Sequence, residues 1–393
     1  MSIDPVRHEG ARSASHTEPL DRNSRARYPG AELSIVIPTF NERSNVAELA
    51  RRLDATLTGI RWEAIFADDN SPDDTARVVR ELSREDGRVR VVHRIGRRGL
   101  SSACIEGMLA SSAPYVAVMD ADLQHDEKLL PRMLDDLRQH DLDLVIGSRY
   151  AAGGSLGELA ADRARISKLA TALSRLVLQA DLKDPMSGFF MLRREVLMEA
   201  MPRLSGIGFK ILLDILASAP RPLRLVERPY TFRARHSGDS KLDSFVAWEY
   251  IMMLLDKTVG RYVPVRFVPF ALIGGLGVFV HLAVLWVMFK MAGQSFEVGL
   301  SVAAIAAMTM NFFLNNLFTY RDRRLRGWSL ITGWISFSIA CSVGLISNVG
   351  IATYLFRQSS IDWAVSALAG IAVGAVWNFA ITSVYTWNKP RAR

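Results

Sequence analysis

The segment Leu33–Glu42 reads LSIVIPTFNE, an apolar run typical of a buried strand followed by a proline and a polar turn. Similar strand-like runs follow at Ala64–Ala67, Val89–His93, Tyr115–Met119 and Leu142–Ile146. Helical periodicity fills the intervals, at Val46–Leu57, Thr75–Leu82, Ser101–Ala110 and Lys128–Leu137. This alternation predicts an α/β fold with a mostly parallel sheet and helices on both faces. Ligands of such sheets bind at the carboxyl ends of the strands.

Charge divides the 393-residue chain into two parts. From Arg261 onward there are 11 Lys and Arg against 3 Asp and Glu, whereas residues 1–260 have 37 of each sign. The whole net charge of +8 therefore belongs to the last third. The charge-balanced remainder lacks the dense basic face of a nucleic-acid-binding domain, so we expect no nucleic-acid partner. The composition also excludes a disordered chain.

The last third contains four long uncharged runs: Phe267–Phe289, Val298–Tyr320, Gly327–Phe356 and Trp363–Asn388. A helix of about 20 apolar residues spans a bilayer, and lipid tolerates no open backbone groups, so we predict four transmembrane helices. Buried helices of a soluble domain are the weaker alternative. The loop Arg321–Arg326 and the tail Asn388–Arg393 are strongly basic, which places both termini in the cytoplasm.

The remaining segments complete the domain organisation. Residues 1–30 lack an apolar core and predict a disordered tail rather than a signal peptide. The α/β domain covers residues 31–243, an amphipathic helix with a linker covers 244–262, and the membrane domain covers 263–393. Two predicted helices, Arg163–Gln179 and Phe245–Val259, either face a core or lie in the membrane interface. The two cysteines, far apart, indicate a reducing compartment and no cysteine metal site.

An acidic motif follows the fourth strand, in Met119–His125, MDADLQH. In an extended chain, Asp120, Asp122 and Gln124 would lie on one side. Three oxygen-bearing side chains suit a hard cation such as Mg²⁺, which shares its remaining positions with substrate phosphates. Such a metal would neutralise a diphosphate leaving group. A solvated acidic turn is the alternative interpretation.

The second strand also ends in carboxylates, at Asp68 and Asp69. Their position suits hydrogen bonds to a ribose or a base edge, whereas Asp73 or Asp74 could serve only as a helix cap. No GxGxxG motif follows the first strand, which argues against a dinucleotide fold of the dehydrogenase type.

Basic side chains recur in the later motifs, and arginine and lysine are the residues that recognise phosphate. They are Arg149 in Gly147–Tyr150, Arg163 with Ser167 at helical spacing, Lys210 at the end of Gly206–Lys210, and Arg235 with Lys241 in one polar loop. A surface ion pair is the alternative for any one of them.

Together the motifs resemble the dolichyl- or polyprenyl-phosphate mannosyltransferases of glycosyltransferase family 2. The matching stretches are VIPTFNE (36–42), ADDNSPDDT (67–75), RRGLSSA (97–103), MDADLQH (119–125), GSRY (147–150), KDPMSGFF (183–190), IGFKILL (207–213) and RHSGDSKL (235–242). The last third resembles the GtrA-like four-helix domain, through RFVPFALIGGLGVFV (266–280) and NFFLNNLFTYRD (311–322).

The resemblance implies a GT-A-type domain, GDP-mannose as donor, a polyprenyl or dolichyl phosphate as acceptor, and Mg²⁺ or Mn²⁺ as cofactor. The guanosine would be held by Pro38, Phe40, Glu42, Ala67 and Asp69. The metal, the diphosphate and the mannose would be held by Asp120, Ala121, Asp122 and Gln124, with Asp120, Asp122 and Gln124 as metal ligands. Donor or acceptor phosphates would contact Arg149, Lys210, Arg235 and Lys241. The lipid phosphate would also contact Arg163 and Ser167. Phe40 departs from the family, which often has tyrosine there.

The resemblance also implies an inverting transfer without a general base, because the lipid phosphate is already anionic; Asp122, Arg149 and Arg235 would be catalytic. The product would be β-linked mannose, made at the cytoplasmic membrane face with no obligate protein partner. Three alternatives remain: another donor such as UDP-glucose, a translocator of lipid-linked sugars, and a processive synthase, whose QxxRW motif is absent. The membrane helices would either anchor the enzyme or move its product.

Overall fold

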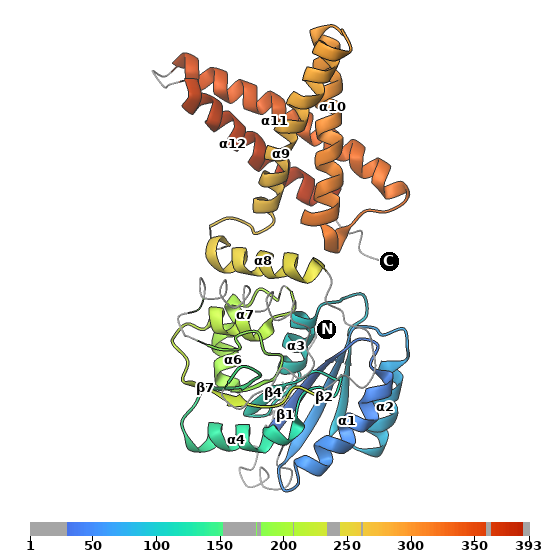
Figure 1. Ribbon diagram of the computed structural model, residues 1–393, viewed down its shortest axis with the longest axis vertical. Coiled ribbons are helices and arrows are strands. Elements are labelled where there is room, and N and C mark those ends of the chain that lie inside the picture. The colour runs from blue at the N-terminus through green and yellow to red at the C-terminus, as the bar shows by residue number, and fades with distance from the viewer. Residues whose placement is uncertain are drawn as a thin grey trace, which may run out of the picture. The chain divides into compact units, whose positions relative to one another are not determined.

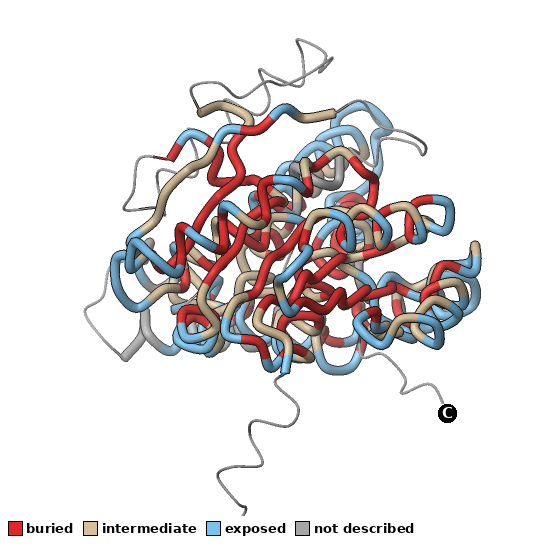
Figure 2. The backbone as a smooth tube through the Cα atoms, turned by 90° about the horizontal axis from the view of Figure 1, so that it is seen from below, coloured by how far each residue is buried: buried red, intermediate tan, exposed pale blue. Residues whose placement is uncertain are grey.

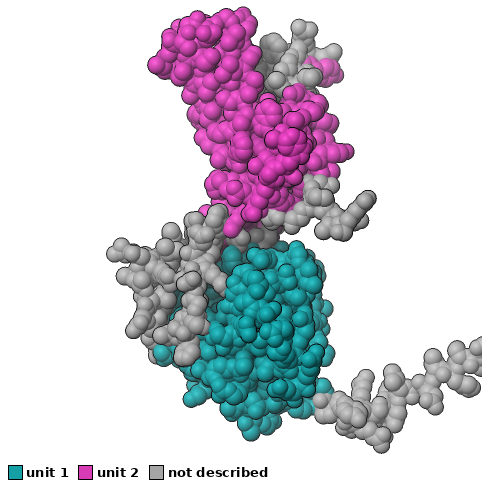
Figure 3. All heavy atoms as spheres, turned by 90° about the vertical axis from the view of Figure 1, so that its right-hand side faces the viewer, with its two compact units in different colours: residues 1–241 teal, residues 242–393 magenta. Residues whose placement is uncertain are grey.

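The computed structural model describes residues 30–151, 178, 182–206, 208–233, 244–260, 262–358 and 363–387. The chain divides into two compact units, Met1–Lys241 and Leu242–Arg393, which Figure 3 colours separately. The predicted N-terminal tail, except for Gly30, lies outside the described residues. So does the predicted helix Arg163–Gln179, except for Leu178.

The first unit is built on one seven-stranded sheet with the strand order β3-β2-β1-β4-β6-β5-β7 (Figure 1). The strands are β1 (Leu33–Thr39), β2 (Trp62–Asp68), β3 (Val89–His93), β4 (Tyr115–Val118), β5 (Leu144–Ser148), β6 (Phe190–Arg193) and β7 (Leu225–Pro229). Only β6 runs antiparallel to its neighbours among these strands. The predicted mostly parallel α/β fold is therefore confirmed.

Helices cover both faces of this sheet. They are α1 (Arg43–Thr56), α2 (Thr75–Glu85), α3 (Leu100–Leu109), α4 (Leu130–Gln139), α6 (Arg194–Ala200) and α7 (Ile211–Ser218), with short 3-10 turns η2 (Glu127–Leu129) and η3 (Met201–Arg203). Alternating residues of β1 supply the two cores: Leu33 and Ile35 pack with α1, α2 and α4, whereas Val36 packs with α3, α6 and α7. Figure 2 shows buried backbone in the interior and exposed residues on the outer turns.

Because β6 runs antiparallel, the loop that precedes it lies at the carboxyl ends of the parallel strands, where ligands of such sheets bind. Phe190, at the start of β6, pairs with Val118 at the end of β4 and with Ile146 in β5. The loop before β6 therefore lies beside the carboxyl ends of its two neighbours. This places the segment Asp184–Phe189 next to the acidic motif.

The second unit is helical. Its elements are α8 (Ser244–Val259), α9 (Phe267–Trp286) with the π-helix η4 (Val287–Met291), α10 (Phe296–Leu314) with the π-helix η5 (Asn315–Thr319), η6 (Arg321–Arg323), α11 (Trp328–Gln358), and α12 (Trp363–Ile381) with the π-helix η7 (Thr382–Thr386). Among the described residues, three stretches are long and apolar enough to cross a membrane: Phe267–Met291, Phe296–Thr319 and Ala369–Thr386. In α11 the apolar stretch Trp328–Gly344 is shorter. The number of four spans stays a prediction.

This unit contains an internal repeat that sequence reasoning missed. Adding 67 to the bounds of α10 and η5 gives the bounds of α12 and η7. The matching sequences, NFFLNNLFTY (311–320) and NFAITSVYTW (378–387), share Asn, Phe and Thr at equivalent places. The unit is therefore built from two copies of a helical hairpin, α9–η5 and α11–η7.

Equivalent contacts recur in the two hairpins. Phe312 packs on Phe337 at a ring distance of 5.8 Å, and its counterpart Phe379 packs on Phe270 at 5.5 Å. The last residues of the two copies, Tyr320 and Trp387, stack on each other at 4.1 Å. A tight helix contact is also repeated: a Cβ on Gly277 would meet Asn311, and a Cβ on Gly344 would meet Asn378. Small residues permit such close helix packing.

Candidate active site

The acidic motif forms a turn rather than an extended segment. Strand β4 ends at Val118, and Leu123 has a positive φ of 63°. The extended chain on which the alternation argument for Asp120, Asp122 and Gln124 depended is therefore not present, and their common role stays a prediction. The turn is held internally instead, since the main-chain N–H of Gln124 donates to Oδ1 of Asp122 at 3.2 Å.

His125 fixes the surroundings of Asp120. The main-chain N–H of Asp120 donates to His125 Nδ1 at 3.0 Å, which leaves the ring proton on Nε2, 3.8 Å from Asp120 Oδ2. The ring is buried and stacks on Phe189 at 5.2 Å. Burial lowers the pKa of His125, so the ring is neutral at pH 7. A neutral imidazole held by this hydrogen bond acts as a positioning group for Asp120.

Gly188 has no side chain and leaves space for the carboxylate of Asp120. A Cβ at this position would lie 3.1 Å from Asp120 Oδ2 and 3.4 Å from His125 Cε1. Partial burial raises the pKa of Asp120, and the charge of Asp122 adds to the rise, whereas the positive charges of Lys210 and Arg149 oppose it. A divalent cation at this site would stabilise the charged form of both carboxylates.

Two cations accompany the acids. Arg149, at the end of β5, donates from Nε and Nη2 to the two oxygens of Asp184, both at 2.9 Å. Asp184 is buried, and its own N–H donates to Glu227 at 2.8 Å. Burial and the charge of Arg149 lower the pKa of Lys210, the residue before α7. The structure therefore brings Asp120, Asp122, Arg149 and Lys210 into one electrostatic neighbourhood.

The predicted nucleotide residues lie at the ends of β1 and β2. Pro38 pairs with Ala67 in the sheet register. Ala67 is fully buried in the sheet. The ring of Phe40 lies under the guanidinium of Arg98 at 4.6 Å. The Glu42 carboxylate accepts a hydrogen bond from Asn45 at 2.8 Å.

The carboxylate of Asp69, which the resemblance assigns to the guanosine, makes several contacts within the protein. It pairs with the buried Arg94 and accepts the N–H of Gly99 at 2.7 Å. Neighbouring Asp68 accepts hydrogen bonds from Thr39 and from Ser71. Both carboxylates hold loops at the ends of β1 to β3, which sequence could not reveal because Arg94 lies 25 residues from Asp69.

Three residues near the acidic loop, which we define as residues 119–127, were not identified from the sequence. Arg233 contacts Gln124, Asp126 and Glu127. The buried hydroxyl of Tyr230, beside His125 at a ring distance of 5.9 Å, has no hydrogen-bond partner in the described part of the chain. Gly188 carries no side chain to signal its role. Single residues of common types, outside any acidic or basic cluster, give no sequence signal of their own.

Other predicted residues cannot be placed. Arg163, Ser167, Arg235 and Lys241 lie outside the described residues, as does Ile207 within the predicted segment Gly206–Lys210. Within the described ranges, no group of three His, Cys, Asp or Glu side chains could hold a metal. Two carboxylates and an amide fit Mg²⁺ or Mn²⁺ only if a bound substrate supplies further oxygens.

A mostly parallel sheet with acids and cations at its ligand edge, in a chain with membrane-length helices, defines a membrane-bound enzyme that handles phosphorylated ligands. Residues 34–200 match glycosyl transferase family 2, and residues 269–387 match the GtrA/DPMS transmembrane domain. The chain is thus a glycosyltransferase with a GT-A-type catalytic domain and a membrane domain.

Comparison with related proteins shows to which group within family 2 the chain belongs. The dolichol-phosphate mannosyltransferase of Pyrococcus furiosus is 36% identical over 360 residues, which cover 91% of this chain and 99% of that protein. The enzyme of the same name from Saccharomyces cerevisiae is 35% identical over 59% of this chain and 88% of its own length. This chain therefore belongs to the dolichol-phosphate mannosyltransferases of family 2. A solved structure of glucosyl-3-phosphoglycerate synthase from Mycobacterium tuberculosis aligns over 60% of this chain and 81% of that chain, with 22% identity and a TM-score of 0.43.

Proposed function

We propose that this enzyme transfers mannose from GDP-mannose to a dolichyl or other polyprenyl phosphate at the cytoplasmic face of the membrane, with inversion and with Mg²⁺ or Mn²⁺. The observation that carries the proposal is the grouping of Asp120 and Asp122 with Lys210 and Arg149 at the sheet edge. The relative from Pyrococcus furiosus, aligned over 91% of this chain, supports the choice of sugar and acceptor.

Asp120, Asp122 and Gln124 would hold the divalent cation, which when bound supplies positive charge to the leaving diphosphate. His125 and Gly188 keep Asp120 in place, by a hydrogen bond and by leaving space. Lys210 and Arg149 add fixed positive charge beside these acids, where phosphate oxygens would gather. Fixed charges that need no reorganisation stabilise a transition state most effectively.

The acceptor removes the need for a general base. A lipid phosphate is already anionic at pH 7, so its oxygen forms the bond to the anomeric carbon as the bond to the diphosphate oxygen breaks. One displacement of this kind inverts the α-linked donor sugar to a β-linked product. The protein's task is to hold the two reactants in line, which accounts for a large share of such rate enhancements. Arg163, Ser167, Arg235 and Lys241 are the cations and hydroxyl that we assign to the lipid phosphate.

A donor panel tests the proposal. The purified full chain in detergent would receive GDP-mannose, UDP-glucose or UDP-galactose, each with dolichyl phosphate and Mn²⁺, and the lipid extract would be scored for sugar. We expect transfer from GDP-mannose alone, and its loss in the presence of a metal chelator. Transfer from UDP-glucose would overturn the donor assignment. No transfer from any donor would favour a translocator of lipid-linked sugars.

A further inference from the structure

Arg233, which follows β7 in the chain, connects to the acidic loop by four hydrogen bonds. Its main-chain N–H donates to the carbonyl of Gln124 at 3.0 Å, and the Gln124 side-chain Nε2 donates back to the Arg233 carbonyl at 3.0 Å. Its guanidinium donates from Nη1 to Glu127 at 2.7 Å and from Nη2 to Asp126 at 2.5 Å. The four bonds bracket the turn that carries Gln124 and His125.

These bonds decide which end of the Gln124 amide is available. Because Nε2 is used by the Arg233 carbonyl, Oε1 is the end that can face a cation, and oxygen is the atom that hard cations bind. Arg233 does not touch the acids of the site. Its main chain orients the Gln124 amide, and its guanidinium, bonded to Asp126 and Glu127, holds that main chain in place, as outer partners that orient metal ligands generally do.

We propose that Arg233 is a positioning residue that presents Gln124 Oε1 to the divalent cation and thereby sets the metal affinity of the acidic loop. This inference rests on the proposed function, because it assumes that the acidic loop holds the cation.

The chain offers a matched control in Arg228. This β7 residue donates from Nε and Nη2 to the two oxygens of Asp136, both at 2.7 Å, and its side chain is 26% exposed, against 32% for Arg233. Both arginines therefore make a partly buried pair of charged hydrogen bonds. Only Arg233 contacts the acidic loop, so a purely structural loss should be similar in the two variants.

The experiment measures Mn²⁺ binding directly, by the loss of the free-ion electron paramagnetic resonance signal in the presence of GDP. We expect Arg233→Ala to weaken Mn²⁺ binding by about 10-fold. Arg233→Lys should restore part of it, and Arg228→Ala should bind as the wild type does, with all melting temperatures measured alongside. Wild-type Mn²⁺ binding by Arg233→Ala would overturn the inference alone. Failure of the wild-type chain to bind Mn²⁺ would overturn the metal assignment itself.

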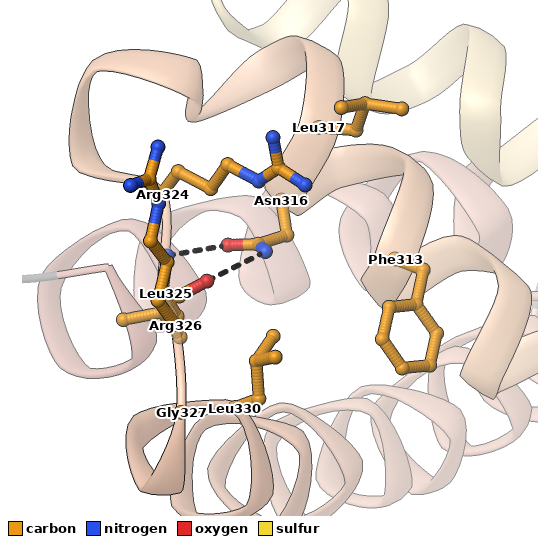
Figure 4. Close-up of a pocket in the computed structure, with 8 residues that line it drawn as sticks. All are labelled: Phe313, Asn316, Leu317, Arg324, Leu325, Arg326, Gly327 and Leu330. Atoms are coloured by element: carbon orange, nitrogen blue, oxygen red, sulfur yellow. Dashed lines mark hydrogen bonds between the residues drawn. The ribbon is translucent and has the colours of Figure 1, made fainter.

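A second, independent observation lies in the membrane unit. A pocket of about 250 Å³ opens between the end of α10 and the start of α11 (Figure 4). It is lined by Phe313, Asn316, Leu317, Arg324, Leu325, Arg326, Gly327 and Leu330. Asn316 is buried and shapes the pocket wall, because its amide exchanges two hydrogen bonds with the main chain of Leu325, at 2.8 and 3.2 Å.

The repeat shows that this wall is a feature of the first hairpin. The residue that corresponds to Asn316 in the second hairpin is Ser383, which lacks a carboxamide. Asn316 also accepts the indole N–H of Trp387 at 3.1 Å, so both copies meet at this residue. In transporters built from repeats, ligands bind where the copies meet.

The pocket combines two exposed cations with apolar walls. Arg324 and Arg326 make no ion pair or hydrogen bond through their side chains within the described residues. Figure 4 shows their guanidinium groups on the opposite side of the Asn316–Leu325 hydrogen bonds from Leu330. Phe313, on the same helix as Asn316, is 51% exposed. A phosphate with an attached hydrocarbon chain satisfies both parts.

We infer that this pocket binds an acidic membrane phospholipid, with its phosphate at Arg324 and Arg326 and a chain along Phe313 and Leu330. The chain's own C-terminal segment is not a complementary occupant, because residues 388–393 contain Lys389, Arg391 and Arg393 and no acid. Juxtamembrane arginines attract anionic lipids.

Native mass spectrometry of the delipidated full chain, titrated with phosphatidylglycerol or phosphatidylcholine, tests this site. We expect phosphatidylglycerol binding to weaken roughly 10-fold in Arg324→Gln with Arg326→Gln. Leu330→Trp, which fills the pocket without a charge change, should weaken it too. The control Lys290→Gln with Arg357→Gln removes equal charge elsewhere in the unit. An equal loss in the control, equal binding of phosphatidylcholine, or pocket-dependent binding of dolichyl phosphate alone would overturn the assignment.

Discussion

Two strand ends of the catalytic unit carry carboxylate pairs that look alike in the sequence and differ in the structure. After β2, Asp68 and Asp69 accept hydrogen bonds from Thr39, Ser71, Gly99 and Arg94. After β4, the Asp120 carboxylate accepts no hydrogen bond from the described residues. It faces the neutral ring of His125 and the bare backbone of Gly188.

This difference separates carboxylates that hold the fold from carboxylates that await a ligand. Buried polar groups are normally hydrogen-bonded, and a partly buried charge without donors is costly. The pair after β2 is satisfied by the protein itself. After β4, Asp122 accepts the N–H of Gln124, whereas the charge of Asp120 is offset by the longer-range charges of Lys210 and Arg149, an arrangement that suits a cation and a diphosphate. Substitutions in the two pairs should therefore affect different properties.

The largest expected effect is on catalysis at the second pair. Asp122→Asn keeps the shape of the side chain and removes its charge, so we expect mannose transfer to fall by about 100-fold or more. The melting temperature of the full chain in detergent should stay within about 2 °C of wild type, since this carboxylate is assigned to a ligand. Sugar counts in the lipid extract measure the first quantity and circular dichroism the second. Wild-type transfer by this variant would remove Asp122 from the site.

The first pair should respond in the opposite way. Asp68 itself is fully buried, and Asp68→Ala leaves the hydroxyls of Thr39 and Ser71 and one main-chain N–H without their acceptor. We expect a loss of about 3 kcal/mol of folding free energy. For a unit of this size that lowers the melting temperature by roughly 6–12 °C. If Asp68→Ala lost activity without a change in melting temperature, the proposed difference between the two carboxylate pairs would be wrong.

Gly188→Ala sharpens the comparison by adding one methyl group beside Asp120. The added Cβ would lie 3.1 Å from Asp120 Oδ2, tight enough to push the carboxylate aside. We expect transfer to fall by about 10-fold, because small misplacements in an active site cost that much or more. Gly87→Ala is the control, since a Cβ there meets nothing within 4 Å. Steady-state transfer rates of the two variants would decide the point, and equal rates would contradict it.

The smallest effect is expected at Asp73, a third strand-end acid that caps two helices. It accepts the N–H of Arg43, the first residue of α1, at 3.1 Å and that of Thr75, the first of α2, at 3.0 Å. Burial opposes the charge, but hydrogen bonds from Thr75 and Arg43 hold the pKa of Asp73 below its usual range. The unfolded chain then binds the proton more tightly, so the carboxylate stabilises the fold above its ordinary pKa of about 4.

We therefore expect Asp73→Ala to cost about 1 kcal/mol at pH 7 and progressively less as the pH falls through the lowered pKa. Chemical unfolding of variant and wild type at pH 7 and at pH 3 measures this. An equal loss of unfolding free energy at the two pH values would show that the charge of Asp73 does not contribute to capping.

Local patterns predicted most of the sheet, because five strands and their helices depend on alternation and periodicity within a few residues. Strand β6 was missed, since four residues, FMLR, form no alternating pattern and their burial comes from β4 and β5 on either side. The turn at Leu123 was missed as well, because a positive φ at leucine has no sequence signal. The types of residue in the acidic motif were informative, but their arrangement depends on His125 and Gly188.

Long-range partners account for what else was missed. Asp69 was assigned to the donor from its position at a strand end, and its pairing with Arg94 depends on a loop from the next strand. Arg233 reaches an acidic loop more than 100 residues away in sequence. The hairpin repeat was hidden because its copies share only a few identities, whereas the matching helix bounds reveal it at once.

The hairpin repeat has a consequence for how such a protein can grow. A hairpin begins and ends at the same end of its helices, so doubling it during evolution leaves the preceding domain on the side of the membrane where it already was. Doubling a single helix would have reversed everything on one side of the insertion. If both hairpins cross the membrane, as the sequence predicts, the unit can grow without moving the catalytic domain to the other side only by such even steps, and the 67-residue spacing of α10 and α12 preserves one of them.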